Sequence, residues 1–254
     1  MGTYPATGVT LLVHKYKGTQ RLASFYTRER GKVEATVSGV GKPGSKLAPA
    51  VEPLVLSRLY FAEGRNLDRL TQCEVVESFY ELRQDLQRLS LAAYAAELVA
   101  RTTEPGHRDP ELFDALVHTL SALTVSDQPE LVTWGFALRY LCLHGIGPVL
   151  DECGLCGQSE PRTWRYVDQM GGLVCDACNG PQGLPILPQV RAALRSLLQL
   201  PPERVDRLRL NPGMQEQIRQ LLRRHIRYHV GVELRSEQFM EKMARAGRTA
   251  GDSE

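Results

Sequence analysis

Residues 31–39 read GKVEATVSG, a stretch in which Val33, Ala35 and Val37 alternate with polar residues. Alternation with a period of two indicates a strand with one buried and one solvated face. Up to about residue 76 the chain has four more strand-like segments between Gly, Pro or charged turns: GVTLLVHKYK (8–17), RLASFYTR (21–28), LVLSRLYFA (54–62) and LDRLTQCEVVES (67–78). Five short strands with uneven loops favour an OB-type β-barrel, although spacing alone leaves a two-sheet sandwich open.

Beyond residue 76 apolar residues recur every three or four positions, which is the helical period. The helical segments are LRQDLQRLSLAAYAAELVA (82–100), DPELFDALVHTLSAL (109–123), QPELVTWGFALRYLCLHG (128–145), LPQVRAALRSLLQL (187–200) and GMQEQIRQLLRRHIRYHV (213–230). Pro110 and Pro129 fit the first turn of a helix, where a missing N–H costs no hydrogen bond.

These patterns predict an α+β multidomain protein. The expected parts are an OB-fold domain (1–76), a helical domain in two parts (77–150 and 184–243), an inserted cysteine module (151–183) and a disordered tail (244–254). The chain has 254 residues, of which 43% are hydrophobic and 24% are charged, and these values are typical of globular proteins. No apolar run reaches the ~18 residues of a membrane span, and the first residues lack a signal-peptide cleavage site, so we expect a cytoplasmic location.

The net charge of +2 is unevenly distributed along the chain. Residues 1–75 carry +5, residues 76–150 carry −5, residues 151–185 carry −3 and residues 186–254 carry +5. Two basic ends therefore flank an acidic middle, a separation that indicates polyanion binding.

Four of the six cysteines form two close pairs, Cys153/Cys156 and Cys175/Cys178, with 18 residues between the pairs. Two such turns can aim four sulfurs at one point, which predicts a Zn²⁺ site with four thiolate ligands. Disulfides or buried thiols are the alternatives, and a reducing cytoplasm disfavours disulfides. Because four thiolates leave no open position, the zinc is expected to be structural. Cys73 and Cys142 lie among apolar residues and are expected in the core.

The loop G39-V-G-K-P-G44 matches the GxGxxG pattern of dinucleotide-binding proteins. The pattern requires a helix directly after it, but Pro43 lies inside the glycines, and Pro49 and Pro53 follow. A phosphate-binding Walker loop is excluded because Ser45 precedes Lys46, the reverse of the required order. We find no nucleophile elbow, kinase set or paired carboxylates either, so we do not expect an enzyme.

A basic loop with Lys42 and Lys46 lies in the barrel segment, near a turn with Arg28, Arg30 and Lys32. Cations interleaved with aromatics suit single-strand binding, in which cations follow phosphates and rings stack on bases. The aromatics available are Tyr4, Tyr16, Phe25, Tyr26, Tyr60 and Phe61. The alternative is that the cations form a solvated rim and most of the aromatics lie in the core.

The predicted helix 213–230 carries Arg219, Arg223 and Arg227 every four residues along one edge, and Arg191 and Arg195 extend the stripe weakly. Like charges at this spacing repel unless an anion relieves them. Anion binding and internal pairing with acidic residues both remain open. His225 and His229 lack the Glu of a zinc-peptidase motif, so we expect helix-surface histidines.

The sequence resembles the RecO family of bacterial recombination mediators. The resemblance lies in GKVEATVSGVGKPGSKLAP (31–49), LTQCEVVESF (70–79), LRYLCLHGIGPVLDECGLCG (138–157) and GGLVCDACN (171–179), which occur in the family's order. Family members often carry an arginine-rich run at residues 38–46, where this chain has only Lys42 and Lys46.

The resemblance implies an OB fold, a helical domain and an inserted zinc finger. It also implies binding of single- and double-stranded DNA, annealing of complementary strands and, together with RecR, help for RecA in replacing the single-strand-binding protein SSB during repair at the nucleoid. A zinc-containing scaffold that receives acidic peptides such as the SSB tail is the alternative function. A zinc-ribbon hydrolase or transferase would need an open metal position.

Overall fold

The computed structural model describes residues 2–179 and 182–251, with side chains described for residues 2–178 and 182–243. The chain forms two compact units. The first contains Met1–Thr124 and Leu234–Glu254, and the second contains Val125–Glu233. The helices are divided between the two units, whereas the sequence predicts one interrupted helical domain.

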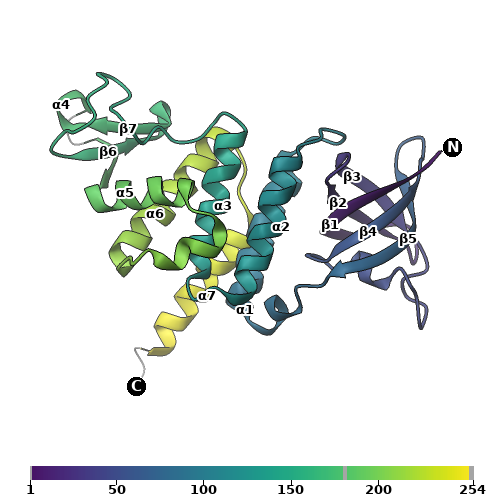
Figure 1. Cartoon of the computed structure of the whole chain (residues 1–254). Helices are drawn as coiled ribbons and strands as arrows, with labels where there is room; N and C mark the ends of the chain where they lie inside the picture. Colours follow the sequence, from purple (N-terminus) through teal and green to yellow (C-terminus); the bar gives the residue numbers. More distant parts are fainter. Residues whose placement is uncertain (1, 180–181, 252–254) are drawn as a thin grey trace. The chain divides into compact units, whose positions relative to one another are not determined.

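The N-terminal segment is a closed β-barrel of five strands in the order β1-β2-β3-β5-β4 (Figure 1). The strands are β1 Thr3–Lys15, β2 Arg21–Thr27, β3 Gly31–Val37, β4 Leu56–Ala62 and β5 Asp68–Glu77. The first part of β1 pairs with β4 and its later part pairs with β2, so one long strand serves both neighbours. A short parallel pairing of β3 with β5, Ala35 opposite Asp68, closes the barrel.

The barrel core consists of the residues that the period-two pattern assigns to the inner face. Val33, Ala35 and Val37 are buried, whereas the residues between them are only half-buried. Phe61 is fully buried at the centre, 5.2 Å from the Tyr4 ring and 5.6 Å from the Phe25 ring, measured between centroids. The predicted alternation is confirmed, and the core is aromatic and aliphatic throughout.

Three long helices accompany the barrel in the first unit: α1 Leu86–Thr102, α2 Pro110–Val125, of which all but Val125 belongs to this unit, and α7 Arg235–Gly251. A 3₁₀ turn, η2 Tyr80–Gln84, precedes α1, and Asp85 caps α1 by accepting the N–H groups of Gln87 and Arg88. The predicted single helix 82–100 is therefore split at its cap. Buried Glu97 of α1 accepts hydrogen bonds from the N–H groups of Arg235 and Ser236, so α1 fixes the first turn of α7.

The backbone of α7 continues through residues 244–251, for which the sequence predicts disorder. Ala and Arg favour helix, and this segment contains no proline. Residues 252–254 of the expected tail lie outside the described residues. Within the described part of the chain, no helix combines the length and apolarity that a membrane span requires.

The second unit packs α3 Pro129–Leu143 against α5 Pro188–Gln199, η4 Pro202–Arg207 and α6 Pro212–His225. Its cysteine module contains η3 Asp168–Met170, α4 Asp176–Asn179 and a small sheet ordered β7 (Gly172–Cys175), β6 (Trp164–Val167), β8 (Leu184–Ile186). The helix predicted for residues 213–230 changes type at His225, because a π-helix, η5 Ile226–Val230, follows it. The Gly231 N–H bonds to the Ile226 carbonyl, five residues back, which closes this wider turn.

Candidate metal centre and nucleic-acid interface

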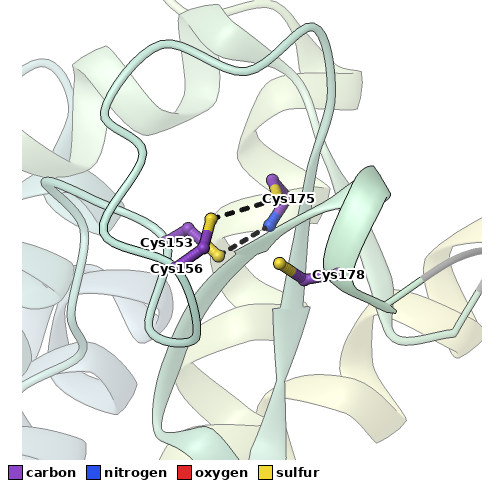
Figure 2. A group of neighbouring side chains, drawn as sticks. All are labelled: Cys153, Cys156, Cys175 and Cys178. Atoms are coloured by element: carbon purple, nitrogen blue, oxygen red, sulfur yellow. Dashed lines mark hydrogen bonds between the residues drawn. The ribbon is translucent and has the colours of Figure 1, made fainter.

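The four paired cysteines converge in the second unit. The sulfur atoms of Cys153, Cys156, Cys175 and Cys178 all lie within 4.8 Å of one another, and Figure 2 shows them from two facing segments. Cys156 Sγ is 3.8 Å from Cys175 Sγ, which is much longer than a disulfide bond. Four such sulfurs form a donor set that could hold one metal ion.

Backbone hydrogen bonds fix the first pair of cysteines. The Gly157 N–H donates to the Cys153 carbonyl at 2.9 Å, and Gly157 has a φ of +74°, a conformation that glycine adopts without strain. The Gly154 N–H donates to the Leu173 carbonyl at 2.9 Å, which attaches this turn to β7. Cys175 is the last residue of β7, so the same strand supports both pairs.

Backbone donors also favour a thiolate at the centre of the cluster. Burial raises the pKa of the Cys153 thiol, but the N–H groups of Cys175, Cys156 and Leu155 donate to it and lower its pKa to about 6. The Cys175 N–H lies 3.3 Å from Cys153 Sγ. Side-chain hydrogen bonds with Cys156 and Cys175 raise the pKa of the Cys178 thiol to about 12 in the absence of a cation. A divalent ion would favour the deprotonated form of every ligand.

Arg191 of α5 attaches the module to the helices. Its guanidinium lies over the Trp164 ring, 4.6 Å from the centroid, and its Nε donates to the Leu150 carbonyl at 2.7 Å. Arg191 is only 8% exposed. Its assignment to the basic stripe is therefore wrong, because its charge is used inside the fold. The sequence offered no signal for this role, since the spacing of Arg191 and Arg195 suits a surface stripe equally well.

His225 is a second attachment point and is 1% exposed, so the expectation of a surface histidine is wrong for this residue. The Ile146 carbonyl, 2.5 Å from Nε2, can only accept, so Nε2 carries the proton. Nδ1 then accepts from the Tyr166 hydroxyl at 2.7 Å. Burial lowers the pKa of His225, which keeps the ring neutral.

Asp168 of η3 contributes further contacts between the module and the helices. Arg224 of α6 approaches its carboxylate with two nitrogens, at 3.0 Å and 2.5 Å. Half-buried His229 donates from Nε2 to the Asp168 carbonyl at 2.8 Å. Arg224 is therefore paired, although it belongs to the basic face of the helix.

In the barrel, three predicted DNA contacts lie in the turn between β2 and β3 or at the start of β3, and each has a partner. Arg28 is paired with Asp114, Arg30 lies over the Tyr4 ring and 3.4 Å from Glu63, and the Lys32 ammonium donates to the Ala100 carbonyl at 3.0 Å. These side chains already stabilise the unit, so binding DNA would require them to exchange or share a partner.

The cations of the basic loop differ from those near the β2–β3 turn in their surroundings. Lys42 and Lys46 are exposed, and neither is in a salt bridge within the described residues. The loop consists of turns, with the Lys42 N–H donating to the Gly39 carbonyl and the Ser45 N–H donating to the Lys42 carbonyl. No long helix follows it, which is consistent with excluding dinucleotide binding.

Most of the aromatics proposed for stacking lie in the core. Tyr4, Phe25, Tyr26 and Phe61 are buried, Tyr60 is half-buried and Tyr16 is 39% exposed. Tyr16 and Tyr60 are therefore the members of this group that remain accessible for contact with a base.

The arginine stripe of the second unit is exposed and partly paired. Arg219 lies 3.1 Å from Glu216 on the same helix, and Arg227 of η5 lies 3.0 Å from Glu233. Arg223 is exposed and has an interaction within the fold. Internal pairing therefore relieves part of the repulsion. Exposed pairs of this kind are weak enough to exchange for a phosphate.

Comparison with known proteins assigns a class to this arrangement of barrel, helices and cysteines. The family model described as "Recombination protein O N terminal" matches residues 1–79, and "Recombination protein O C terminal" matches residues 83–238. The chain belongs to the RecO family of DNA repair proteins.

Individual relatives match over almost the whole chain. A DNA repair protein RecO from Heliobacterium modesticaldum is 37% identical, covering 97% of this chain and 92% of the relative. One from Pelotomaculum thermopropionicum is 32% identical, covering 99% and 98%, respectively. The Bacillus subtilis protein of the same name is 27% identical, with 96% of each covered.

Proposed function

We propose that this chain is a non-catalytic recombination mediator that binds single- and double-stranded DNA and anneals complementary strands. In this proposal it acts in the cytoplasm at the nucleoid, together with RecR, and helps RecA replace SSB on single-stranded DNA. Membership in the RecO family supports a role in recombination repair. The proposal extends this role to particular partners and to particular residues.

The observation that carries DNA binding is the exposed loop of the barrel, in which Lys42 and Lys46 have no salt bridge among the described residues. Phosphates can replace condensed counterions at such cations without first breaking an ion pair. The five-stranded closed barrel supports an OB-type assignment, which is a fold used widely for single strands.

Annealing requires no covalent chemistry. A protein that anneals strands must reduce the repulsion between two phosphate backbones while leaving the base edges free to pair. Cations on the barrel and on the arginine stripe would supply this. The contacts we propose are Arg28, Arg30, Lys32, Lys42 and Lys46 in the first unit and Arg219, Arg223 and Arg227 in the second. Those without a partner are expected to contribute most.

We also propose that Cys153, Cys156, Cys175 and Cys178 hold one structural Zn²⁺. The sulfurs within 4.8 Å and the N–H groups behind Cys153 fit a soft divalent ion. When bound, the ion would join the two cysteine pairs and leave no position for a substrate. The module carries −3 before metal binding, so it is a poor surface for DNA.

The main experiment is strand annealing on SSB-coated DNA, with and without RecR. The purified chain should accelerate annealing, and RecR should enhance RecA loading. DNA affinity should fall steeply between low and physiological salt. An affinity that does not change with ionic strength would rule out the proposed mechanism.

A charge-reversal triple variant tests the stripe. Changing Arg219, Arg223 and Arg227 to Glu should weaken DNA binding while the far-ultraviolet spectrum stays unchanged. The matched control reverses Arg204, Arg207 and Arg209, three exposed arginines of the same unit. Equal losses in both variants would mean that only overall charge matters, and that the stripe is not a contact surface.

One observation favours a second function, a scaffold for acidic peptides. Tyr228 is 54% exposed and lies next to Arg227 in the sequence, so an apolar anchor and a cation occur together. A peptide with the acidic, apolar-ended character of the SSB tail should then bind, and Tyr228→Ala should weaken it. If that peptide binds while DNA does not, the scaffold function replaces the mediator function.

A further inference from the structure

The barrel has a cavity at the end where the β1–β2 turn meets the loop after β3. Its volume is about 470 Å³, and its lining includes Lys15, Thr19, Arg21, Val40, Gly41 and Val51. Ligand-binding pockets typically occupy about 300–1,000 Å³. The cavity is therefore large enough for a small ligand or for one unit of a polymer.

Two cations of the lining face each other across a strand pair. Lys15 at the end of β1 is directly opposite Arg21 at the start of β2. Like charges in directly opposed positions destabilise a strand pair. Neither residue is in a salt bridge within the described residues, and Arg21 donates a long hydrogen bond of 3.4 Å to the Gln20 carbonyl. An anion between them would convert this repulsion into attraction.

The charges next to the cavity point to the same kind of ligand. Lys17 adds a third cation in the β1–β2 turn, with its ammonium 5.6 Å from the centroid of the Tyr16 ring. Lys42 directly follows Gly41 of the lining. Glu52, next to Val51, is the acidic residue closest in sequence to the cavity lining, and its carboxylate lies 3.9 Å from the Arg83 guanidinium. The lining itself contains two cations and no acid.

The lining also contains apolar side chains. Val40 and Val51 are half-buried and pack against the barrel core. A cavity lined by two cations and two valines matches a nucleotide, whose phosphate is charged and whose sugar and base have apolar faces. A single strand can place an unpaired base in such a cavity, whereas the bases of a duplex are stacked and paired inside the helix.

We propose that this cavity binds one nucleotide of single-stranded DNA, with Lys15 and Arg21 on a backbone phosphate and the sugar or base against Val40 and Val51. The inference rests on the proposed DNA-binding function. It adds two contact residues, Lys15 and Arg21, and a structural reason for preferring single strands.

The test compares two double variants of the full chain that remove the same charge. Lys15→Ala with Arg21→Ala alters the cavity, and Arg65→Ala with Arg69→Ala removes two exposed cations of the first unit that do not line it. Binding to an oligothymidylate of about 20 nucleotides, and to a duplex of equal length, is measured by fluorescence anisotropy over a salt series. Thermal unfolding of each variant checks the fold.

Loss of this one single-strand phosphate contact should reduce the salt slope by about 0.7 and weaken binding about fivefold near 0.1 M salt. The control should change single-strand affinity about twofold or less, which is typical of exposed charges outside the contact. On the duplex, both double variants should behave alike. Equal single-strand losses in the two variants overturn the inference while leaving DNA binding intact, whereas a wild-type chain that binds no DNA overturns both proposals.

A steric variant keeps the inference testable if the double variant unfolds. Gly41 lines the cavity, and a Cβ built on it meets no atom within 4 Å. Gly41→Leu should therefore fold, keep every charge and fill part of the cavity. It should weaken oligothymidylate binding at least fivefold and leave duplex binding unchanged. Unchanged single-strand binding by a folded Gly41→Leu protein would overturn the proposal.

Discussion

The barrel and the cysteine module are both small β structures, but different forces hold them together. Phe25, Leu59 and Phe61 are fully buried in the barrel, where seven-residue and longer strands surround an apolar core. The module has strands of four, four and three residues and buries fewer large side chains, among them Leu173 and Ile186. We propose that its stability depends in addition on the cysteines, on Arg191 over Trp164 and on the Tyr166–His225 bond. Long strands can bury enough apolar surface to stabilise a small β structure. A structure with short strands buries less and depends more on metal ligation and specific polar contacts.

The largest expected effect is loss of the metal from the module. Cys153→Ser should release the ion that we propose for this site and unfold the cysteine module, because metal binding contributes about 10–16 kcal/mol to structural zinc sites of finger peptides. Metal content by mass spectrometry and tryptophan fluorescence report this. Trp164 lies in the module and Trp134 in α3 of the same unit, and the chain has two tryptophans, so the barrel does not contribute.

The matched control for this prediction is Cys73→Ser, which removes a half-buried thiol of β5 outside the cluster. It should retain the full metal content. If Cys153→Ser also retains the metal, the assignment of ligands is incorrect and the module is held together in another way.

The next largest effect concerns the barrel alone. Phe61→Ala removes a fully buried ring that contacts Tyr4 and Phe25, so unfolding should become easier by about 3–5 kcal/mol. Denaturant unfolding followed by circular dichroism measures this change. Tyr80→Ala, at a 60% exposed position, is the control and should change stability by about 0.5 kcal/mol or less. If the metal content also falls in Phe61→Ala, the barrel and the cysteine module are not stabilised independently of each other.

A smaller effect is expected from the polar contact between module and helix. Tyr166→Phe removes the hydroxyl that donates to Nδ1 of buried His225, and the unpaired nitrogen should cost about 1–3 kcal/mol. The loss should appear in the tryptophan-detected transition and not in the barrel. His225→Gln, which keeps polar atoms at this position, should lose less than His225→Ala. Equal losses would show that packing and not hydrogen bonding is important here.

The same histidine makes stability depend on pH. Burial lowers the pKa of His225 below its unfolded value of about 6.5, so the unfolded chain binds more protons below that pH. The contribution of His225 to the free energy of unfolding of the second unit should therefore be fully present above about pH 6.5 and should decrease as the pH falls below that value. His225→Gln should flatten this part of the pH profile, and an unchanged slope would assign it to other groups.

The sequence predicted the elements of the barrel and helices well, because their cores follow simple periods. All five strands and the helices at α1, α2, α3, α5 and α6 lie within the predicted segments or close to them. The convergence of the cysteines also followed from spacing, since CxxC turns constrain two sulfurs locally. These features depend on neighbours in the sequence, which a pattern can record.

The sequence did not predict how individual cations are used. Arg28, Arg30 and Lys42 look alike in the sequence, but the fold gives partners to the first two through Asp114 and Glu63, far away in the chain. Arg191 and His225 are buried by contacts with Leu150, Ile146 and the module. No pattern in the sequence singles out Lys15 and Arg21, because only the strand register places them opposite each other. Partners distant in the chain leave no periodic signal.

The smallest effects are expected where the two units resemble each other, at their exposed ion pairs. Arg28 and Asp114 are 50% and 37% exposed in the first unit, and Arg227 and Glu233 are 68% and 58% exposed in the second. Solvent screens such pairs, so Arg28→Ala and Arg227→Ala should each cost about 1 kcal/mol or less by denaturant unfolding. A larger loss in one unit would mean that its ion pair is structural and unavailable to DNA. Small losses in both would mean that a phosphate can replace either carboxylate at little cost, so these arginines can serve binding without weakening the fold.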